Sequence, residues 1–302
     1  MKNYRIIAGL LCGTILATTM IGSAAKAEAL TAGDTCVSLG ADLSSDQRAK
    51  VLSLMNLTEA DLANCTVLTV TNDEEHEAFD SYLPQDVIGG NSLSSAKVVA
   101  KGEGNGINVA TQNISYCTVE MYQNALVTAG VKNADVVVVG PERISGTAAL
   151  LGVTKAYEEM TGEALKAEGV DTAADELVTT SGLGEAIGDQ EKAAELIATV
   201  KEAVAEGVED EDDIRELIIK VSAELDIELT DEQIDEILAL MKKISQLDLD
   251  TDELKSQVKD LYQKLKEQGL DLGISDVEAD SIIDSIINWF AGIWDKICSI
   301  FS

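Results

Sequence analysis

Basic residues are scarce in this 302-residue chain. It has 22 lysines and arginines against 54 aspartates and glutamates, which gives a formal net charge of −32. Nucleic acids and anionic lipids repel a protein of this charge, which argues against either of them as a partner. Because 36 of the 54 acids lie beyond residue 162, the excess belongs mainly to the second half of the chain.

Histidine is also nearly absent, and His76 is the only one. A serine nucleophile with a histidine base would therefore have to use His76. The sequence has no Cys-x-x-Cys pair and no P-loop ending, so it indicates neither a ribbon-type zinc site nor a nucleotide loop. Residues 248–252 begin like a calcium loop, but Glu253 and Lys259 replace its sixth-position glycine and twelfth-position glutamate. We predict no metal and no cofactor.

Residues 1–27 have the pattern of a secretion signal. Lys2 and Arg5 precede an apolar run that ends at Ile21, and the segment closes with the small-residue pattern Ala25-Lys26-Ala27. We expect cleavage at that pattern and a secreted or cell-envelope, extracytoplasmic location. A retained signal anchor is the alternative, because the apolar run is close to the shorter limit for a membrane span.

Four cysteines remain after the expected cleavage, and an exported protein can join them in disulfides. Cys65 and Cys117 both flank predicted strands, so they are our first choice of pair. The remaining two are Cys36 and Cys298. Free buried thiols are the alternative reading of all four.

Residues 28–162 have the pattern of an α+β domain, a small mixed sheet with helices packed on one side of it. Short β-branched or apolar runs predict the strands, and capping boxes and glycine stops delimit the helices. Residues 102–106 are glycine-rich and favour a hairpin turn. The strand–helix–strand step that follows should be a right-handed crossover if its strands are parallel. The expected strands are 65–71, 97–101, 107–114 and 136–139, and the expected helices begin near residues 44, 117 and 145.

Strand signals end beyond residue 162. Residues 163–189 are rich in glycine, threonine and aspartate, and we expect a loose linker there. Residues 190–302 show the three-and-four spacing of amphipathic helices, which predicts an acidic all-helical domain. Its last segment, residues 282–302, gathers isoleucines, both tryptophans and two of the three phenylalanines. This helix either docks on the first domain or contacts a membrane surface or a partner.

Three stretches carry a resemblance to a known family. They are VTNDEEH (Val70 to His76), GINVATQNISYCTVEMYQNALVTAG (Gly106 to Gly130) and ADVVVVGPERISGTAALLGVTKAYEEMTG (Ala134 to Gly162). With them the chain resembles the YpuA-like family, the domain-of-unknown-function family 1002 of exported proteins from Gram-positive bacteria. The resemblance implies export and a two-part layout, but it implies no activity and carries over no catalytic residue.

The turn before the helix near residue 145 is the first candidate site. Ser145 can cap that helix, and Gly146 and Thr147 would present free amides at its positive end, with Arg143 as a nearby cation. Such a turn can hold an anion or a carboxylate, although capping and close packing explain the same residues. A second cluster of acids, residues 73–77, either binds a cation or charges a helix N-terminus.

Three functions are open at this point. We favour a non-enzymatic secreted or envelope protein that binds a ligand, another envelope component or a protein partner, because no complete catalytic set is present. A hydrolase acting on envelope material is the alternative, and it requires Arg143, Ser145, Thr147, Asn113 and His76 to converge on one cleft. A structural protein that docks through residues 282–302 is the third.

Overall fold

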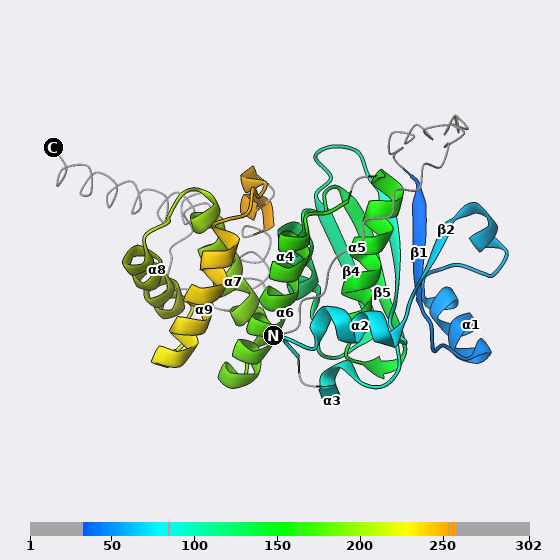
Figure 1. The fold of residues 1–302 in the computed structure, drawn as a ribbon, viewed down its shortest axis with the longest axis horizontal. Helices are drawn as coiled ribbons and strands as arrows, with labels where there is room; N and C mark the ends of the chain where they lie inside the picture. The colour runs from blue at the N-terminus through cyan, green and yellow to red at the C-terminus, as the bar shows by residue number, and fades with distance from the viewer. Residues whose placement is uncertain (1–32, 84, 163, 253, 258–302) are drawn as a thin grey trace, which may run out of the picture.

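A five-stranded sheet and a bundle of helices beside it make up the described part of the protein (Figure 1). The structure is a computed structural model, and it describes residues 33–257 except 84, 163 and 253. The sheet has the order β2-β1-β3-β5-β4. Its strands are β1 (Thr35–Gly40), β2 (Thr66–Val70), β3 (Ser95–Ala100), β4 (Ile107–Ile114) and β5 (Ala134–Ile144).

Strand β3 runs against the other four. β1 pairs parallel with β2 and β4 pairs parallel with β5, whereas β3 is antiparallel to both β1 and β5. The predicted α+β class and mixed sheet are therefore confirmed. The predicted hairpin of β3 and β4 is wrong, because β5 lies between them. The all-valine run of β5 suits a strand buried on both faces, whereas the polar alternation of β4 suits the edge. Strand β1 was not among the expected strands.

Helices cover both faces of the sheet, not one face as expected. Helix α4 (Val119–Ala129) and helix α5 (Thr147–Thr161) pack on the face that carries Cys36 and Val136. Helix α1 (Ser45–Leu54) packs on the opposite face. Successive side chains of a strand point to opposite faces, so the inner strands β1 and β5 supply apolar residues to both cores. The residues of the second core are Val37, Leu39, Val51, Leu52, Met55 and Val139.

Strand β5 is longer than expected. The predicted stop at Gly140 and Pro141 is absent, and the strand continues to Ile144, which pairs with Ile114 beyond a bulge in which residues 140–143 of β5 face Asn113 of β4. Asn113 lies opposite that bulge with φ 61°, and its side-chain amide donates to the carbonyl of Gly140 at 3.0 Å. Asparagine tolerates this left-handed conformation, so Asn113 has a structural role at the bulge.

Three short helical elements lie between α1 and β3 in the chain. The first is a 3₁₀ turn at Asp61–Asn64. Helix α2 (Asn72–Phe79) follows β2 directly, and the Thr71 side chain caps it by accepting from the Glu74 amide. Helix α3 (Gln85–Ile88) comes next. Because only Thr71 separates β2 from α2, the first turn of α2 lies at the carboxyl end of the sheet.

The segment 163–189 is not the loose linker that the sequence predicted. It contains α6 (Ala167–Ile187), a 21-residue helix that packs along α4 and places Ala173 and Leu177 in the core of the sheet domain. Small residues let α6 approach α4 closely, and the hydroxyls of Thr172 and Thr180 bond to carbonyls four residues earlier in their own helix. A composition that is typical of loops therefore forms a buried helix.

Three further helices form a third core. They are α7 (Gln190–Ala205), α8 (Glu211–Glu224) and α9 (Asp231–Ile244), and their apolar faces meet as the amphipathic spacing predicted. In Figure 1, α4 and α6 stand between the sheet and this group. No helix in the described ranges is long and apolar enough to cross a membrane. The predicted signal segment and the predicted helix at 282–302 lie outside the described residues.

A buried ion pair joins the helical group to the sheet domain. Lys201 of α7 is fully buried, and its Nζ lies 2.7 Å from Glu176 Oε1 and 3.0 Å from the carbonyl oxygen of Asn124 in α4. Thr128 of α4 donates to the other oxygen of Glu176. Burial lowers the pKa of Lys201, and the neighbouring Glu176 opposes that change. The network links α4, α6 and α7 through charged groups that have no contact with solvent.

Candidate functional site

A cavity of about 380 Å³ opens where the parallel strands end. Its walls come from the loops and helix starts at this edge: the first turn of α2, the segment before β3, the residues after β4 and the end of β5. Ligands of open α/β sheets bind outside the carboxyl ends of the strands, where loops from several strands meet. We call this cavity the carboxyl-edge pocket. Its lining includes Glu75, Gly89, Ser94, Ser115, Arg143 and Ser145.

Glu75 is the charged group inside this pocket wall. Its side chain is only 2% exposed, and its Oε1 accepts a hydrogen bond of 2.5 Å from the Thr147 hydroxyl. Its Oε2 has no hydrogen-bond partner among the described residues. Burial raises the pKa of Glu75, and the Thr147 hydroxyl lowers it in part. The nearby Asn72 side chain and Ala148 amide also lower it, although neither has the geometry of a hydrogen bond to Oε2. No lysine or arginine of the described chain forms a salt bridge with Glu75.

Glu75 also explains how α5 begins. The predicted cap, Ser145, does not cap this helix; its N-cap residue is Gly146, with φ 101° and no side chain to accept from the first turn. The Glu75 carboxylate lies against that turn instead, where the positive helix end favours a negative charge. The anion that the sequence predicted at this turn is therefore supplied, at least on one oxygen, by the chain itself.

A side chain of α4 holds the turn between β5 and α5 in place. Tyr122 of α4 is fully buried, and its hydroxyl donates to the Gly146 carbonyl at 2.5 Å. A Cβ at position 146 would come within 2.6 Å of the Ile114 side chain, so only glycine fits there. Cys117 lies beside Tyr122, and burial raises the pKa of its thiol to about 12, which makes it unreactive at neutral pH.

Ser145 and Arg143 line the pocket, as the sequence suggested for one site. The Ser145 hydroxyl lies 3.3 Å from the Thr147 hydroxyl, which in turn donates to Glu75. Thr147 is buried behind the lining. Arg143 is exposed at the end of β5 and forms no salt bridge with any described residue. A row of hydroxyls thus leads from the pocket to a buried carboxylate, with a guanidinium at its margin.

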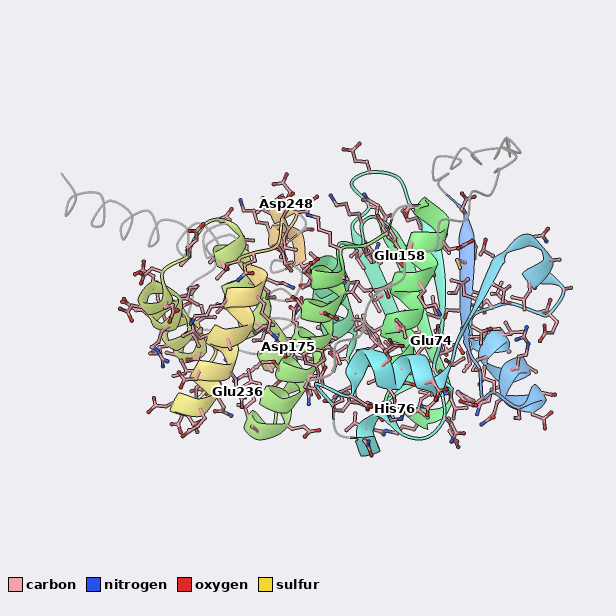
Figure 2. The ribbon with its side chains drawn as sticks, viewed as in Figure 1. Glu74, His76, Glu158, Asp175, Glu236 and Asp248 are labelled. Carbon is pink, nitrogen blue, oxygen red and sulfur yellow. The ribbon has the colours of Figure 1, made fainter. Side chains whose placement is uncertain are left out.

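His76 and Asn113 do not line the pocket. His76 projects from α2, next to Glu75 in sequence (Figure 2). Its Nδ1 lies 2.7 Å from Asp80 Oδ1 and its Nε2 lies 3.1 Å from the Gly89 carbonyl oxygen. The Asp80 carboxylate raises the pKa of His76. Both ring nitrogens are engaged, so His76 holds the Gly89 wall of the pocket and is not paired with Ser145. The five-residue convergence required for a hydrolase is therefore only partial.

The predicted disulfide of Cys65 and Cys117 is wrong. Cys36, Cys65 and Cys117 are all free thiols. Cys65 lies just before β2, at the amino end of the parallel strands, whereas Cys117 lies just after β4, at the carboxyl end. Flanking a strand does not bring two cysteines together when they flank opposite ends of the sheet. Cys298 lies outside the described residues.

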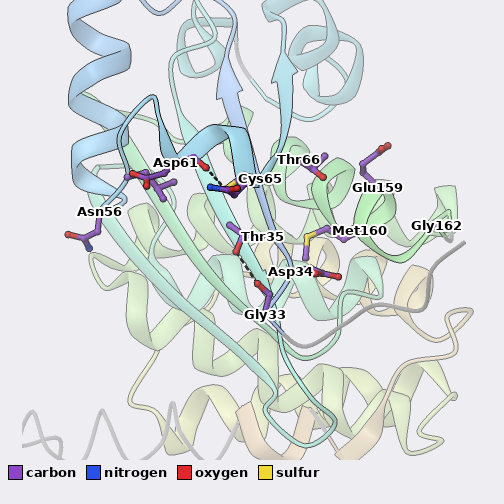
Figure 3. A pocket seen from close by; sticks show the side chains of 12 residues that line it. Gly33, Asp34, Thr35, Asn56, Asp61, Cys65, Thr66, Glu159, Met160 and Gly162 are labelled. Atoms are coloured by element: carbon purple, nitrogen blue, oxygen red, sulfur yellow. Dashed lines mark hydrogen bonds between the residues drawn. The ribbon is translucent and has the colours of Figure 1, made fainter.

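A larger hollow of about 650 Å³ lies at the amino edge of the sheet (Figure 3). Asp34, Asp61 and Glu159 give it an acidic lining, but Asp61 already accepts from the amide and hydroxyl of Thr58. No group of three or more histidine, cysteine or acidic residues in the described chain is arranged to hold a metal ion. This hollow has no buried polar atom without a partner, which makes the carboxyl-edge pocket the stronger candidate.

The comparison with known proteins places the chain in a family. The family model described as "Protein of unknown function (DUF1002)" matches residues 39–261, which include every residue that lines the carboxyl-edge pocket. The chain belongs to the DUF1002 family. This DUF1002 chain is 42% identical over 299 residues to the uncharacterized protein YpuA of Bacillus subtilis (strain 168), over 98% of its own length and 99% of that protein. The YpuA-like resemblance is thereby confirmed. No solved structure matches the DUF1002 chain.

Sequence reasoning did not single out Glu75 among the acids of residues 73–77. The chain offers one local signal. Thr71 and Glu74 form a capping box directly after a strand, which fixes Glu75 in the first turn of α2. The partner of Glu75, however, is 72 positions away in sequence, and only the fold brings Thr147 to it.

Proposed function

We propose that this DUF1002 protein is exported and binds a small ligand in the carboxyl-edge pocket without transforming it. The observation that carries the proposal is the second oxygen of Glu75, which is buried in the pocket wall and has no hydrogen-bond partner among the described residues. Buried polar atoms are nearly always satisfied, by protein, by ordered water or by a ligand. A bound ligand would satisfy this one.

The pocket also has the size and support of a preformed site. Its volume of about 380 Å³ lies at the small end of ligand pockets, which run from roughly 300 to 1,000 Å³. Its walls are held from outside by two contacts: His76 to the Gly89 carbonyl, and the amide of Ser92 to the Asp42 carboxylate at 2.7 Å. Rigid walls reduce the entropy that binding must overcome.

Binding is a better match to this geometry than hydrolysis. Ser145 makes no hydrogen bond with His76, because both ring nitrogens of His76 face Asp80 and Gly89. The hydroxyl of Thr147 stands between Ser145 and Glu75, so the carboxylate has no direct bond to the serine. The hydrolase alternative depends on that indirect row of groups. The docking alternative depends on residues 282–302, outside the described ranges.

The proposal of export rests on the signal-like pattern of residues 1–27. We expect the mature protein to begin at Glu28 and to occur in the medium or the envelope. N-terminal sequencing of the protein recovered from cell fractions tests this, and an intact Met1 in the cytoplasm would contradict it.

The ligand proposal is tested with small-molecule extracts of the medium and the envelope. Saturation-transfer NMR on the purified protein should reveal compounds that bind, and Ser145→Trp should abolish their signals because it fills the pocket. Ser81→Trp is the matched control, since Ser81 is exposed and lies outside the lining. Binding that survives Ser145→Trp, or extracts that give no binding compound, would contradict the proposal.

A further inference from the structure

Two groups of opposite charge line the carboxyl-edge pocket, and neither has an ionic partner in the described part of the chain. Glu75 contributes a carboxylate from α2, and Arg143 contributes a guanidinium from the end of β5. The salt bridges of the described residues involve neither Glu75 nor Arg143. One small pocket therefore offers a negative and a positive group together.

The contact of Glu75 with the start of α5 uses only one of its two carboxylate oxygens. Its Oε1 accepts from Thr147, but its Oε2 is buried without a partner. An unsatisfied buried acceptor is unfavourable by about 1–3 kcal/mol, and by more when it is charged. A ligand ammonium supplies both the missing N–H donors and the missing positive charge. A metal ion is a poorer match, because no cluster of three or more metal-binding side chains occurs among the described residues.

Arg143 supplies the complementary half. A guanidinium presents a planar fork of N–H donors that matches a carboxylate. Ser115 and Ser145 belong to the same lining, and their hydroxyls can bond to polar groups of a ligand. The volume of about 380 Å³ restricts that ligand to a small molecule.

We infer that the carboxyl-edge pocket binds an amino-acid-type zwitterion, either a free amino acid or a very short peptide. Its ammonium lies at Glu75 and its carboxylate lies at Arg143. This inference rests on the proposed function, because it names the class of ligand for the same pocket. The two charged groups together favour a zwitterion. A ligand with only an amine would leave Arg143 without a partner, and a ligand with only a carboxylate would leave Glu75 without one.

Calorimetric titration of the purified protein at pH 7 tests the inference with defined probes. Both enantiomers of alanine and of dialanine serve as zwitterions, while N-acetylalanine lacks the ammonium and alaninamide lacks the carboxylate. We expect at least one zwitterion to bind and each one-charge analogue to bind about tenfold more weakly or worse, because each loses a charge-assisted hydrogen bond. The alanine and dialanine arms separate a free amino acid from a peptide.

Glu75→Gln provides the protein side of the test. Glutamine keeps the size of the side chain and an oxygen that accepts from Thr147, so the cap of α5 is retained while the charge is lost. We expect zwitterion binding to weaken about tenfold or more, and likewise in Arg143→Gln. Glu77→Gln is the control, since Glu77 is an exposed acid of the same helix that does not line the pocket.

Three outcomes would overturn the inference: no zwitterion binds, the one-charge analogues bind as tightly as alanine or dialanine, or Glu75→Gln binds as the wild type does. The comparison of analogues uses the wild-type protein, so it decides even if a variant fails to fold. An extract compound that carries one charge or none, and that Ser145→Trp blocks, would overturn the zwitterion and leave the proposed function intact.

Discussion

Lys201→Met is expected to destabilise the protein strongly. The substitution removes the cation from the buried network and leaves the Glu176 carboxylate, 1% exposed, without a counter-charge. Breaking a buried ion pair by deleting one partner raises the free energy of the folded state by about 3–5 kcal/mol. That is a large part of the roughly 5–15 kcal/mol by which a protein is stable.

The double variant separates the pair from the packing around it. Lys201→Met combined with Glu176→Leu removes both charges and keeps apolar volume, so we expect a loss of no more than about 2 kcal/mol, caused by the bonds that Asn124 and Thr128 lose. Lys242→Met is the surface control. Lys242 pairs with Glu211 at 2.5 Å, but both side chains are well exposed, and such pairs contribute about 0–1 kcal/mol.

Urea unfolding followed by far-UV circular dichroism measures all of these free energies. The reasoning would be refuted if Lys201→Met lowered the free energy of unfolding by less than about 1 kcal/mol. It would also be refuted if the double variant lost as much unfolding free energy as Lys201→Met and Glu176→Leu lose in sum. The two charges would then act independently.

Three further predictions concern other parts of the molecule. The imidazole of His76, the single histidine, should titrate above the usual pKa of about 6.5 in NMR, and Asp80→Asn should lower that pKa; an unchanged value would contradict the bond to Asp80. Burial raises the pKa of Glu195 to about 8, so the stability it contributes is complete below the usual carboxyl pKa and is lost as the pH rises to about 8; Glu195→Gln should flatten the fall in unfolding free energy over that range. Gly152→Ala should destabilise by about 1–3 kcal/mol in urea unfolding, because its methyl group would collide with the Ser38 hydroxyl, and Ser38→Ala should restore part of the loss.

Much of the fold could be predicted because its signals are local. The apolar run of β5 marked a central strand, the capping box at Ser44 marked the start of α1, and Gly130 marked the end of α4. Each of these depends on residues within a few positions of one another. The helix between β4 and β5 allowed a parallel pairing, and the two strands are parallel.

The errors concern relations between distant residues. Glycine-rich residues 102–106 looked like a hairpin turn, but β5 takes the place beside β3 because its apolar run gains more from burial on both faces. The same applies to the site. The turn at Gly146 was predicted as the place for an anion, yet only the fold shows that Glu75 reaches it and that His76 faces Asp80 and Gly89 instead.

Helix α6 sets the smallest part of the chain that can fold alone. A cut after Gly162 would look natural from composition, but it would remove Ala173 and Leu177 from the first core and expose the side of α4 that they cover. A fragment of the sheet domain would therefore need to extend at least to Ile187. Since Lys201 ties α7 to the same helix, heat or denaturant should melt the sheet and the helices in one transition, and proteases should find no early cleavage site between them.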